Sequence, residues 1–202
     1  MITSATTNVL KEWAVAVEAL QQGKSIMLLR KGGIKEAGNR FQFTYDQVLL
    51  YPTYEHQQSH LLKTEYANQV KSVISGWHPE TIRISSWAKI TEILQISEQS
   101  TVKALLPYHI WNEQFAAERF NWKPRHPLYI LLLRVYQLLE PVQISYQQEY
   151  GGCRSWINLI EPISIQDTPP VLTDVEYRTQ VREIKQIINS SQSDLDSAKS
   201  DI

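Results

Sequence analysis

The sequence predicts an α+β protein with an irregular mixed or antiparallel sheet and flanking helices, followed by a C-terminal helix and a disordered tail. Segments rich in β-prone residues and segments with helical spacing follow one another, without the regular βαβ alternation of a doubly wound sheet. The chain has 202 residues, 43% of them hydrophobic, and is long enough to bury a core. A stretch with two prolines follows the main part of the chain, and the chain ends in a polar, acidic segment. The expected parts are a main domain at 1–165 (one body, or two lobes at 1–75 and 76–165), a linker at 166–174, a helix at 175–189 and a tail at 190–202.

The opening segment predicts one helix followed by a small sheet. The helix begins at a capping threonine, ends at Gly23 and carries apolar residues at helical spacing; the cap is Thr6 or Thr7, and the apolar residues are Val9, Leu10, Trp13, Val17 and Leu20. The segment 25–31 is apolar and predicts a buried strand. Further β-prone residues fill 40–52 and stop at Pro52.

The middle of the chain changes from a helical to a β pattern. Residues 53–74 are compatible with a helix, which Gly76 and Pro79 break. Residues 81–96 alternate between apolar and polar side chains, as a strand does. We therefore expect a helix and then a strand here.

The remaining elements are short helices, paired strands and the terminal helix. A short helix is expected at 97–106 and a second within 108–122. Two strands, at 127–139 and 142–150, are expected to pair through a short connection, and a third at 155–160 ends before a proline; the connection is Glu140–Pro141 and the proline is Pro162. The narrow apolar stripe of the terminal helix predicts that it docks on the core: Val175, Val181, Ile184 and Ile188.

Charge and cysteine content exclude several classes of protein. The formal net charge of -1 argues against a uniformly basic nucleic-acid binder, although local segments differ in sign. The one cysteine, Cys153, excludes an internal disulfide and any cysteine-rich metal site, and it favours a reducing, cytoplasmic location. The most apolar stretch is too short to cross a bilayer and contains Arg134, so no membrane segment is expected.

The loop around Gly32 and Gly33 has two interpretations. Basic residues flank the glycines, among them Arg30 and Lys31, and backbone N–H groups at a glycine pair can form an anion-binding nest. The spacing matches neither a phosphate-binding Walker loop nor a dinucleotide-binding loop. A plain turn between two strands and a diffuse attraction for phosphate both remain open.

The stretch from Arg119 to Arg134 carries four basic residues, no acidic residue and several aromatic ones. Guanidinium groups contact phosphates while aromatic faces stack on exposed bases, as in the binding of single-stranded or flipped-base nucleic acid. The alternative is a loop whose aromatic side chains enter the core and whose charges are solvated. The predicted nucleic-acid-binding residues are Arg30, Lys31, Arg119, Trp122, Lys123, Arg125 and His126.

A catalytic function is the rival hypothesis. Glu55 and His56 are neighbours, and His56 would share a helix face with His60, but the pattern lacks a third metal ligand, so no bound metal or other cofactor is expected. Cys153 is a candidate nucleophile because Arg154 would lower the pKa of its thiol, with His126 or His109 as base.

Two further alternatives concern the terminal helix. The nuclease element Glu-x-Lys occurs only at Glu183 to Lys185, where its carboxylate would not meet carboxylates on the sheet. The terminal helix also offers a scaffold function through binding of another protein. The leading expectation is a non-catalytic protein that recognises nucleic acid.

Six stretches together resemble one protein family: LKEWAV, LLRKGGI, LYPTYEHQ, RFNWKPRHPL, LLLRVYQL and GCRSWINL. The family is bacterial, common in cyanobacteria, and described as domain of unknown function 1802. Some of its members are joined to Mrr-like restriction endonuclease domains. The resemblance implies an accessory or recognition role on DNA in a restriction–modification-like system, with cleavage by a separate nuclease chain. It implies no particular catalytic residue.

Overall fold

The structure is a computed structural model that describes residues 4–31, 35–37, 40–42, 45–124, 126–152 and 154–200. Residues 35–37, 40–42 and 191–200 are described by their backbone. The fold is α+β, as the sequence predicts, and its sheet is mixed.

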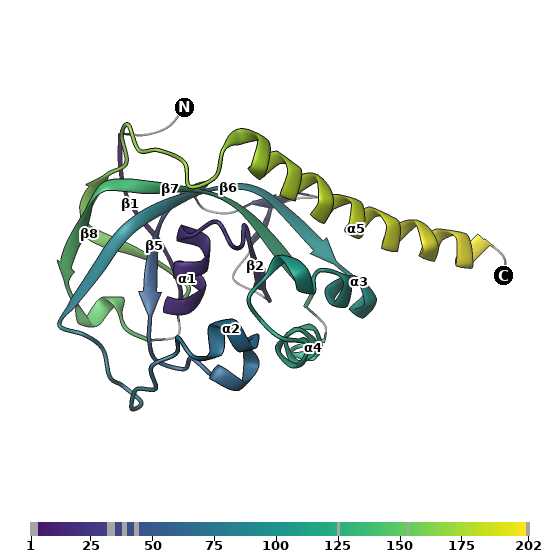
Figure 1. Ribbon diagram of the computed structural model, residues 1–202, viewed down its shortest axis with the longest axis horizontal. Helices are drawn as coiled ribbons and strands as arrows, with labels where there is room; N and C mark the ends of the chain where they lie inside the picture. Colours follow the sequence, from purple (N-terminus) through teal and green to yellow (C-terminus); the bar gives the residue numbers. More distant parts are fainter. Residues whose placement is uncertain are drawn as a thin grey trace.

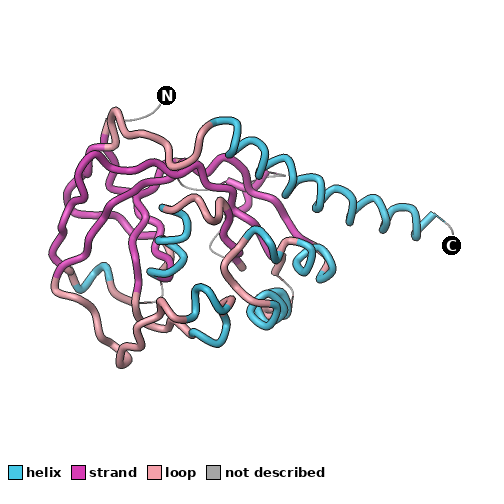
Figure 2. Tube along the Cα trace, viewed as in Figure 1, coloured by secondary structure: helices cyan, strands magenta, loops and turns pink. Residues whose placement is uncertain are grey.

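A six-stranded sheet with the order β2-β7-β6-β5-β1-β8 forms the centre of the fold. Its strands are β1 (Ala5–Trp13), β2 (Met27–Arg30), β5 (Gln47–Thr53), β6 (Thr81–Ile96), β7 (Leu128–Ser145) and β8 (Trp156–Ser164). The pair β1 and β5 is parallel, and the other neighbours are antiparallel. Two short strands, β3 (Lys35–Ala37) and β4 (Arg40–Gln42), pair separately. Figures 1 and 2 show the long strands β6 and β7 arching over the helices.

The helices are α1 (Ala14–Gln21), α2 (Thr64–Ala67), α3 (Gln99–Ala104), α4 (Glu113–Asn121) and α5 (Asp174–Ser200). Successive residues of a strand face opposite sides of a sheet, and the core follows this rule. Leu10 and Leu50 pack in one apolar cluster with the helices, whereas Val9 and Leu49 pack in a second cluster on the other face. The central strands are therefore buried on both faces. None of the helices in the described part of the chain is long and apolar enough to cross a membrane.

The prediction of a helix from Thr6 or Thr7 is wrong for its first half. Residues Ala5–Trp13 form β1 between β5 and β8, and the helix covers only Ala14–Gln21. Val9 and Trp13 have helical spacing, but Val9 and Leu10 are both buried because the strand is covered on both faces. The predicted end at Gly23 is confirmed, where a φ of +68° favours glycine.

The prediction of a helix at 53–74 is also wrong. After β5 the chain turns at Glu55 and His56, and His56 has a φ of +64°. A single 3₁₀ turn (Ser59–Leu61) and the four-residue α2 follow. The segment packs by burying a few apolar side chains rather than a helical face: Leu61, Leu62 and Tyr66.

The predicted pair of strands at 127–139 and 142–150 is one strand, β7, which runs through Pro141. The register of β6 and β7 shifts between Ile84↔Val142 and Ser86↔Gln137, so Pro141 lies in a bulge, where the missing N–H breaks no ladder bond. In the same way β8 continues through Pro162 at a register shift against β1. The predicted strand at 81–96 is confirmed as β6.

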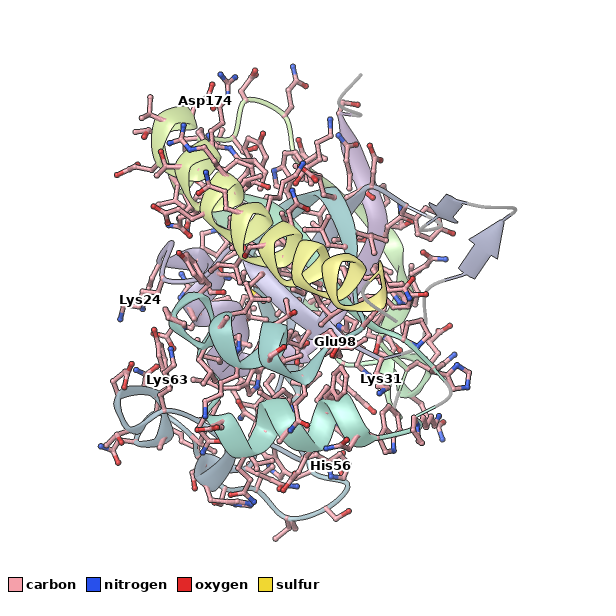
Figure 3. All side chains as sticks on the ribbon, turned by 90° about the vertical axis from the view of Figure 1, so that its right-hand side faces the viewer. Lys24, Lys31, His56, Lys63, Glu98 and Asp174 are labelled. Atoms are coloured by element: carbon pink, nitrogen blue, oxygen red, sulfur yellow. The ribbon has the colours of Figure 1, made fainter. Side chains whose placement is uncertain are left out.

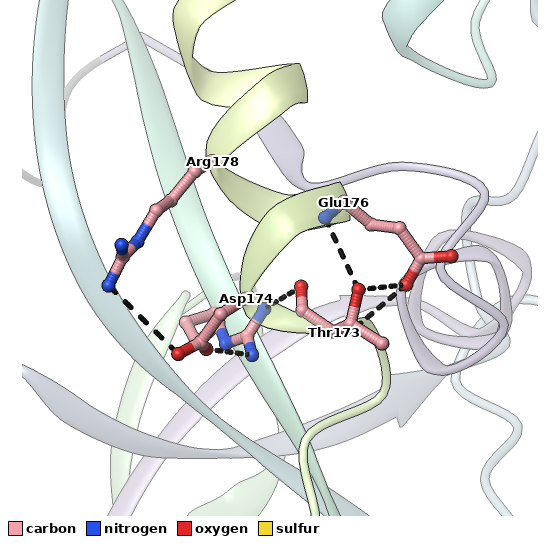
Figure 4. A network of polar contacts seen from close by, with 5 residues as sticks. Thr173, Asp174, Glu176 and Arg178 are labelled. Carbon is pink, nitrogen blue, oxygen red and sulfur yellow. Dashed lines mark hydrogen bonds and ion pairs between the residues drawn. The ribbon is translucent and has the colours of Figure 1, made fainter.

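Helix α5 docks on the core, as predicted, through buried Ile184 and Ile188 and partly buried Val181. Val175, the fourth residue of the predicted stripe, is exposed, and Tyr177 is buried in its place. At the start of α5, Thr173 and Glu176 form a reciprocal cap: Glu176 N–H donates to Thr173 Oγ1 at 3.3 Å and Thr173 N–H donates to Glu176 Oε2 at 2.8 Å (Figure 4). The α5 backbone is helical to Ser200, beyond the predicted end at 189. The disorder of the tail stays a prediction.

Candidate functional site

A cleft of about 1040 Å³ opens where β1 and β5 end. These strands are parallel, with Trp13 opposite Thr53, so their last residues and the turn after β5 lie at one edge of the sheet. The end of β2, helix α4 and two loops, 76–79 and 146–156, supply the remaining walls. Segments that are distant in the sequence therefore meet at this edge.

The lining of the cleft is aromatic and basic. Among the described lining residues, six are lysine or arginine and three are glutamate: Lys11, Arg30, Lys31, Arg119, Lys123 and Arg154 against Glu12, Glu55 and Glu118. Nine are phenylalanine, tyrosine or tryptophan. Five of the seven predicted nucleic-acid-binding residues are thus brought together: Arg30, Lys31, Arg119, Trp122 and Lys123.

Arg30 is neutralised within the cleft wall. Its Nη2 lies 2.8 Å from Glu12 Oε2 and donates to the Lys11 carbonyl at 3.0 Å, and its Nη1 donates to Ser155 Oγ at 2.9 Å. Both side chains of the ion pair are largely buried. The contacts of Arg30 connect the ends of β1 and β2 to the chain at Ser155. Because Glu12 offsets the positive charge of Arg30, this arginine contributes little net charge to the cleft.

Lys31 and Lys11 also serve the protein itself. The Lys31 ammonium donates to the Phe120 carbonyl at the end of α4, and burial lowers the pKa of Lys31. Figure 3 shows Lys31 near the end of α4. The Lys11 ammonium donates to the carbonyls of Tyr150 at 2.6 Å and Gly152 at 2.9 Å. These two lysines therefore hold the cleft walls in place.

Arg119 is different, because no hydrogen bond or ion pair engages it within the described part of the chain. Phe115, Arg119 and Trp122 follow one face of α4 and its end, since they are three and four residues apart. The guanidinium carbon lies 5.0 Å from the centre of the Phe115 ring and 5.7 Å from that of Trp122. Burial is the main cause that lowers the pKa of Arg119, yet an arginine stays charged at neutral pH. Arg119 is a half-buried cation without a direct ion pair in the described structure, although the nearby charge of Glu12 opposes the lowering of its pKa.

Trp122 and Lys123 form the rim beside Arg119. Trp122 is 47% exposed, and the ammonium of Lys123 lies 4.4 Å from its ring centre. An exposed indole with a neighbouring ammonium offers one face for stacking and a charge close to it.

The other wall carries aromatic residues that the sequence analysis did not single out. Trp77 is 41% exposed and meets Tyr54 edge to face, with ring centres 6.0 Å apart. His78 stacks on Tyr146 at 3.4 Å between ring centres. The segment SGWHPE was interpreted only as a helix breaker, although an aromatic residue in such a loop is itself a signal of a binding surface.

Glu55 and His56 lie in the cleft wall but are committed to a turn. Glu55 Oε1 accepts from the Gly76 N–H at 2.6 Å and from Ser75 Oγ at 3.2 Å, and His56 Nε2 lies 3.3 Å away. The Gly76 hydrogen bond is the main cause that lowers the pKa of Glu55. These hydrogen bonds hold the carboxylate in the turn, and its catalytic role stays a prediction.

The expected helical pairing of His56 with His60 is wrong, because His56 lies in a turn and His60 is not part of the cleft lining. Among the described residues, no group of three or more histidine, cysteine, aspartate or glutamate side chains is arranged to hold a metal ion.

Two other residues named in the catalytic alternatives lie outside the cleft lining. His109, one of the two histidines considered as a base for Cys153, is buried away from the cleft. Lys185, part of the Glu-x-Lys element in α5, pairs with Glu92 at 2.8 Å.

The remaining predicted residues either lie away from the cleft lining or fall outside the described residues. His126 is exposed but is not among the lining residues. Gly32, Gly33, Arg125 and Cys153 lie outside the described residues. The predicted roles of Arg125 in binding and of Cys153 in catalysis stay predictions.

The described part of the chain is an α+β protein with a large cleft lined by aromatic and basic residues. The chain belongs to the family described as Domain of unknown function (DUF1802), which matches residues 9–183. Five of the six stretches that carry the family resemblance contribute residues to the cleft; the sixth, LLLRVYQL, lies in β7.

No curated protein matches the chain. Among solved structures, the chain is similar to ASCH from Zymomonas mobilis, with 14% identity over 87% of this chain and 93% of that chain and a TM-score of 0.41. A serine-to-alanine variant of the same protein shows 13% identity over 91% of this chain and 99% of that chain, with a TM-score of 0.42.

Proposed function

We propose that the cleft binds unpaired nucleotides of a nucleic acid, and that the protein recognises this ligand without cleaving it. One observation carries the proposal: Arg119, a half-buried cation without a direct ion pair in the described structure, lies beside Trp122, whose indole is half exposed. A phosphate oxygen fits the first group and an unpaired base fits the second.

The cleft still carries positive charge for an anionic ligand when the cations that are engaged within the protein are left out of the count. Arg30 is paired with Glu12, and the ammonium groups of Lys11 and Lys31 donate to carbonyls. The cations that remain for a ligand are Arg119 and Lys123, together with the exposed Arg154, whose Nη2 also donates to the Glu149 carbonyl. Partial burial makes an ionic hydrogen bond to Arg119 stronger than one on an open surface, because water screens it less.

The carboxylates of the cleft favour recognition over catalysis. Glu12 is paired with Arg30, Glu55 is bound to the turn at Gly76, and Glu118 accepts a hydrogen bond from Gln114 at 2.9 Å. Each of these three carboxylates is thus engaged by a neighbouring group of the protein, whereas a general acid or base has to face the reacting atoms. The proposal includes DNA as the nucleic acid and a separate nuclease chain as partner, as the family resemblance implies.

Fluorescence anisotropy with labelled single-stranded oligonucleotides tests the proposal. Arg119→Gln is expected to weaken binding and to lower the slope of log K against log salt by about 0.7, because one phosphate contact is lost. Trp122→Ala is expected to weaken binding by about 1–3 kcal/mol with little change in that slope.

Matched controls are Arg178→Gln and Leu139→Ala, which remove an exposed arginine and an exposed apolar side chain outside the cleft. Both controls are expected to bind as the unaltered protein does. Undetectable binding of single strands by the unaltered protein at low salt would refute the proposed function.

A further inference from the structure

The cleft has two exposed tryptophans on different walls. Trp122 ends α4, and Trp77 lies in the loop that follows α2. In Figure 1 this loop and α4 lie on different sides of α2. They are the two large apolar side chains of the described cleft lining that are more than a third exposed. An exposed indole in a cleft is a surface prepared for a ligand.

Trp77 is held in a fixed position. Its ring packs edge to face on Tyr54, and the turn before it is bound through Glu55 to the backbone at Gly76. Gly76 has a φ of +80°, which lets the chain turn sharply there. A rigid aromatic side chain binds at a low cost in conformational entropy, so Trp77 is a stacking platform comparable to Trp122.

A series of contacts connects the wall of Trp77 and the wall of Arg30 with the segment that follows Tyr146. Beside Trp77, His78 stacks on Tyr146, and Gly151 lies so close to Tyr146 that a Cβ there would be 2.5 Å from its hydroxyl oxygen. Four residues further on, Ser155 accepts a hydrogen bond from Arg30. Gly151, beside Tyr146, and Ser155, beside Arg30, therefore lie in one short stretch of sequence and contact different walls of the cleft.

Positive charge lies along this series of contacts. Arg154 is exposed and lines the cleft between the wall of Tyr146 and the wall of Arg30. Glu12, the partner of Arg30, is close enough to favour the charged form of Arg119. Arg119 in turn lies next to Trp122. The described cleft lining thus holds two aromatic platforms, Trp77 and Trp122, and two cations, Arg154 and Arg119.

We infer that the cleft takes an extended single strand of several nucleotides, with one base on Trp122, another on Trp77 and the intervening phosphates facing Arg154 and Arg119. This inference rests on the proposed function and specifies its ligand. A duplex has no exposed base face, and one extruded base would use a single platform. An extended strand uses both platforms and the charge between them.

The test measures the affinity of labelled oligothymidylates from the dinucleotide to a sixteen-mer, together with thymidine monophosphate as competitor. Affinity is expected to rise with length until both platforms are covered. Trp77→Ala and Trp122→Ala are each expected to raise the Kd of the longest oligonucleotide by about 5- to 150-fold. Trp77→Phe keeps a ring against Tyr54 and is expected to restore most of the affinity, which separates a lost platform from a disturbed loop. Leu139→Ala is the control.

The outcomes separate this inference from the proposed function. If Trp122→Ala weakens binding while Trp77→Ala matches Leu139→Ala, the second platform is refuted and the proposed function stands. If a dinucleotide binds as tightly as the sixteen-mer, the inference of an extended strand is refuted. If the unaltered protein binds none of the oligonucleotides at low salt, both proposals fail.

Discussion

Mild acid is expected to destabilise the fold through His109. Its side chain is 2% exposed, and neither ring nitrogen has a hydrogen-bond partner in the described structure. Burial, and then the charge of Lys63, lowers the pKa of His109 from 6.5 to about 4, against a weaker opposing effect of nearby backbone groups. His109 is therefore buried as a neutral ring.

The sign of the effect follows from proton binding. The unfolded chain binds a proton at His109 near pH 6.5, whereas the folded chain binds it only near pH 4. The contribution of His109 to the free energy of unfolding is complete above pH 6.5 and is lost as the pH falls to about 4. The difference between the two pKa values corresponds to about 3 kcal/mol.

Urea unfolding followed by tryptophan fluorescence, at steps between pH 7.5 and pH 4.5, measures this loss. His109→Phe keeps an aromatic ring beside Trp111 and removes the titrating group, so its free energy of unfolding is expected to change much less over this range. His60→Gln, at an exposed histidine, is expected to behave as the unaltered protein does. Equal pH dependence in His109→Phe and the unaltered protein would show that His109 is not the group responsible.

Three further predictions concern stability. Asp174→Ala is expected to cost about 1–3 kcal/mol, because the Arg134 guanidinium, only 7% exposed, loses the carboxylate 2.8 Å away; an unchanged urea midpoint would contradict this. Deletion of residues 190–202 is expected to leave the melting temperature unchanged, since this polar segment offers little apolar surface for a core, and a loss of many degrees would show that it packs. Gly23→Ala is expected to destabilise more than Gly76→Ala: both have a positive φ, but the new Cβ at Gly23 would lie 2.6 Å from a leucine side chain, whereas Gly76 faces open space. Equal melting temperatures of these two variants would refute that comparison.

The local sequence was enough to predict the elements whose apolar residues alternate or recur at helical spacing between residues that interrupt regular structure. The strand Thr81–Ile96 was predicted residue for residue, because its alternation follows a glycine and proline and ends before a capping region. Helix α4 was predicted in its middle, and its start is fixed locally by Asn112, whose side chain accepts from the Phe115 N–H at 3.0 Å. The α+β class follows from such elements.

Pairing between distant segments decided the elements that the sequence analysis assigned wrongly. Val9 and Leu10 fit a helix and a strand equally well, and β1 is a strand because β5 and β8 lie on its two sides. Pro141 predicts the end of a strand by its propensity alone, whereas the bulge against β6 lets the strand continue. Local propensity is weak compared with burial between two neighbouring strands, so it cannot settle such positions.

The chemistry of the cleft was visible in the sequence, but its arrangement was not. Arg119, Trp122 and Lys123 are close along the chain, and their aromatic and basic character was readable from the sequence. Arg30 and Lys31 join them only because β2 pairs with β7, and the same packing engages both with partners. Trp77 reaches the cleft through its contact with Tyr54 and the Glu55 turn. A sequence states which charges and rings a chain carries; the tertiary structure decides which are neutralised by neighbours and which face a ligand, because ion pairs and stacking depend on distances between segments remote along the chain.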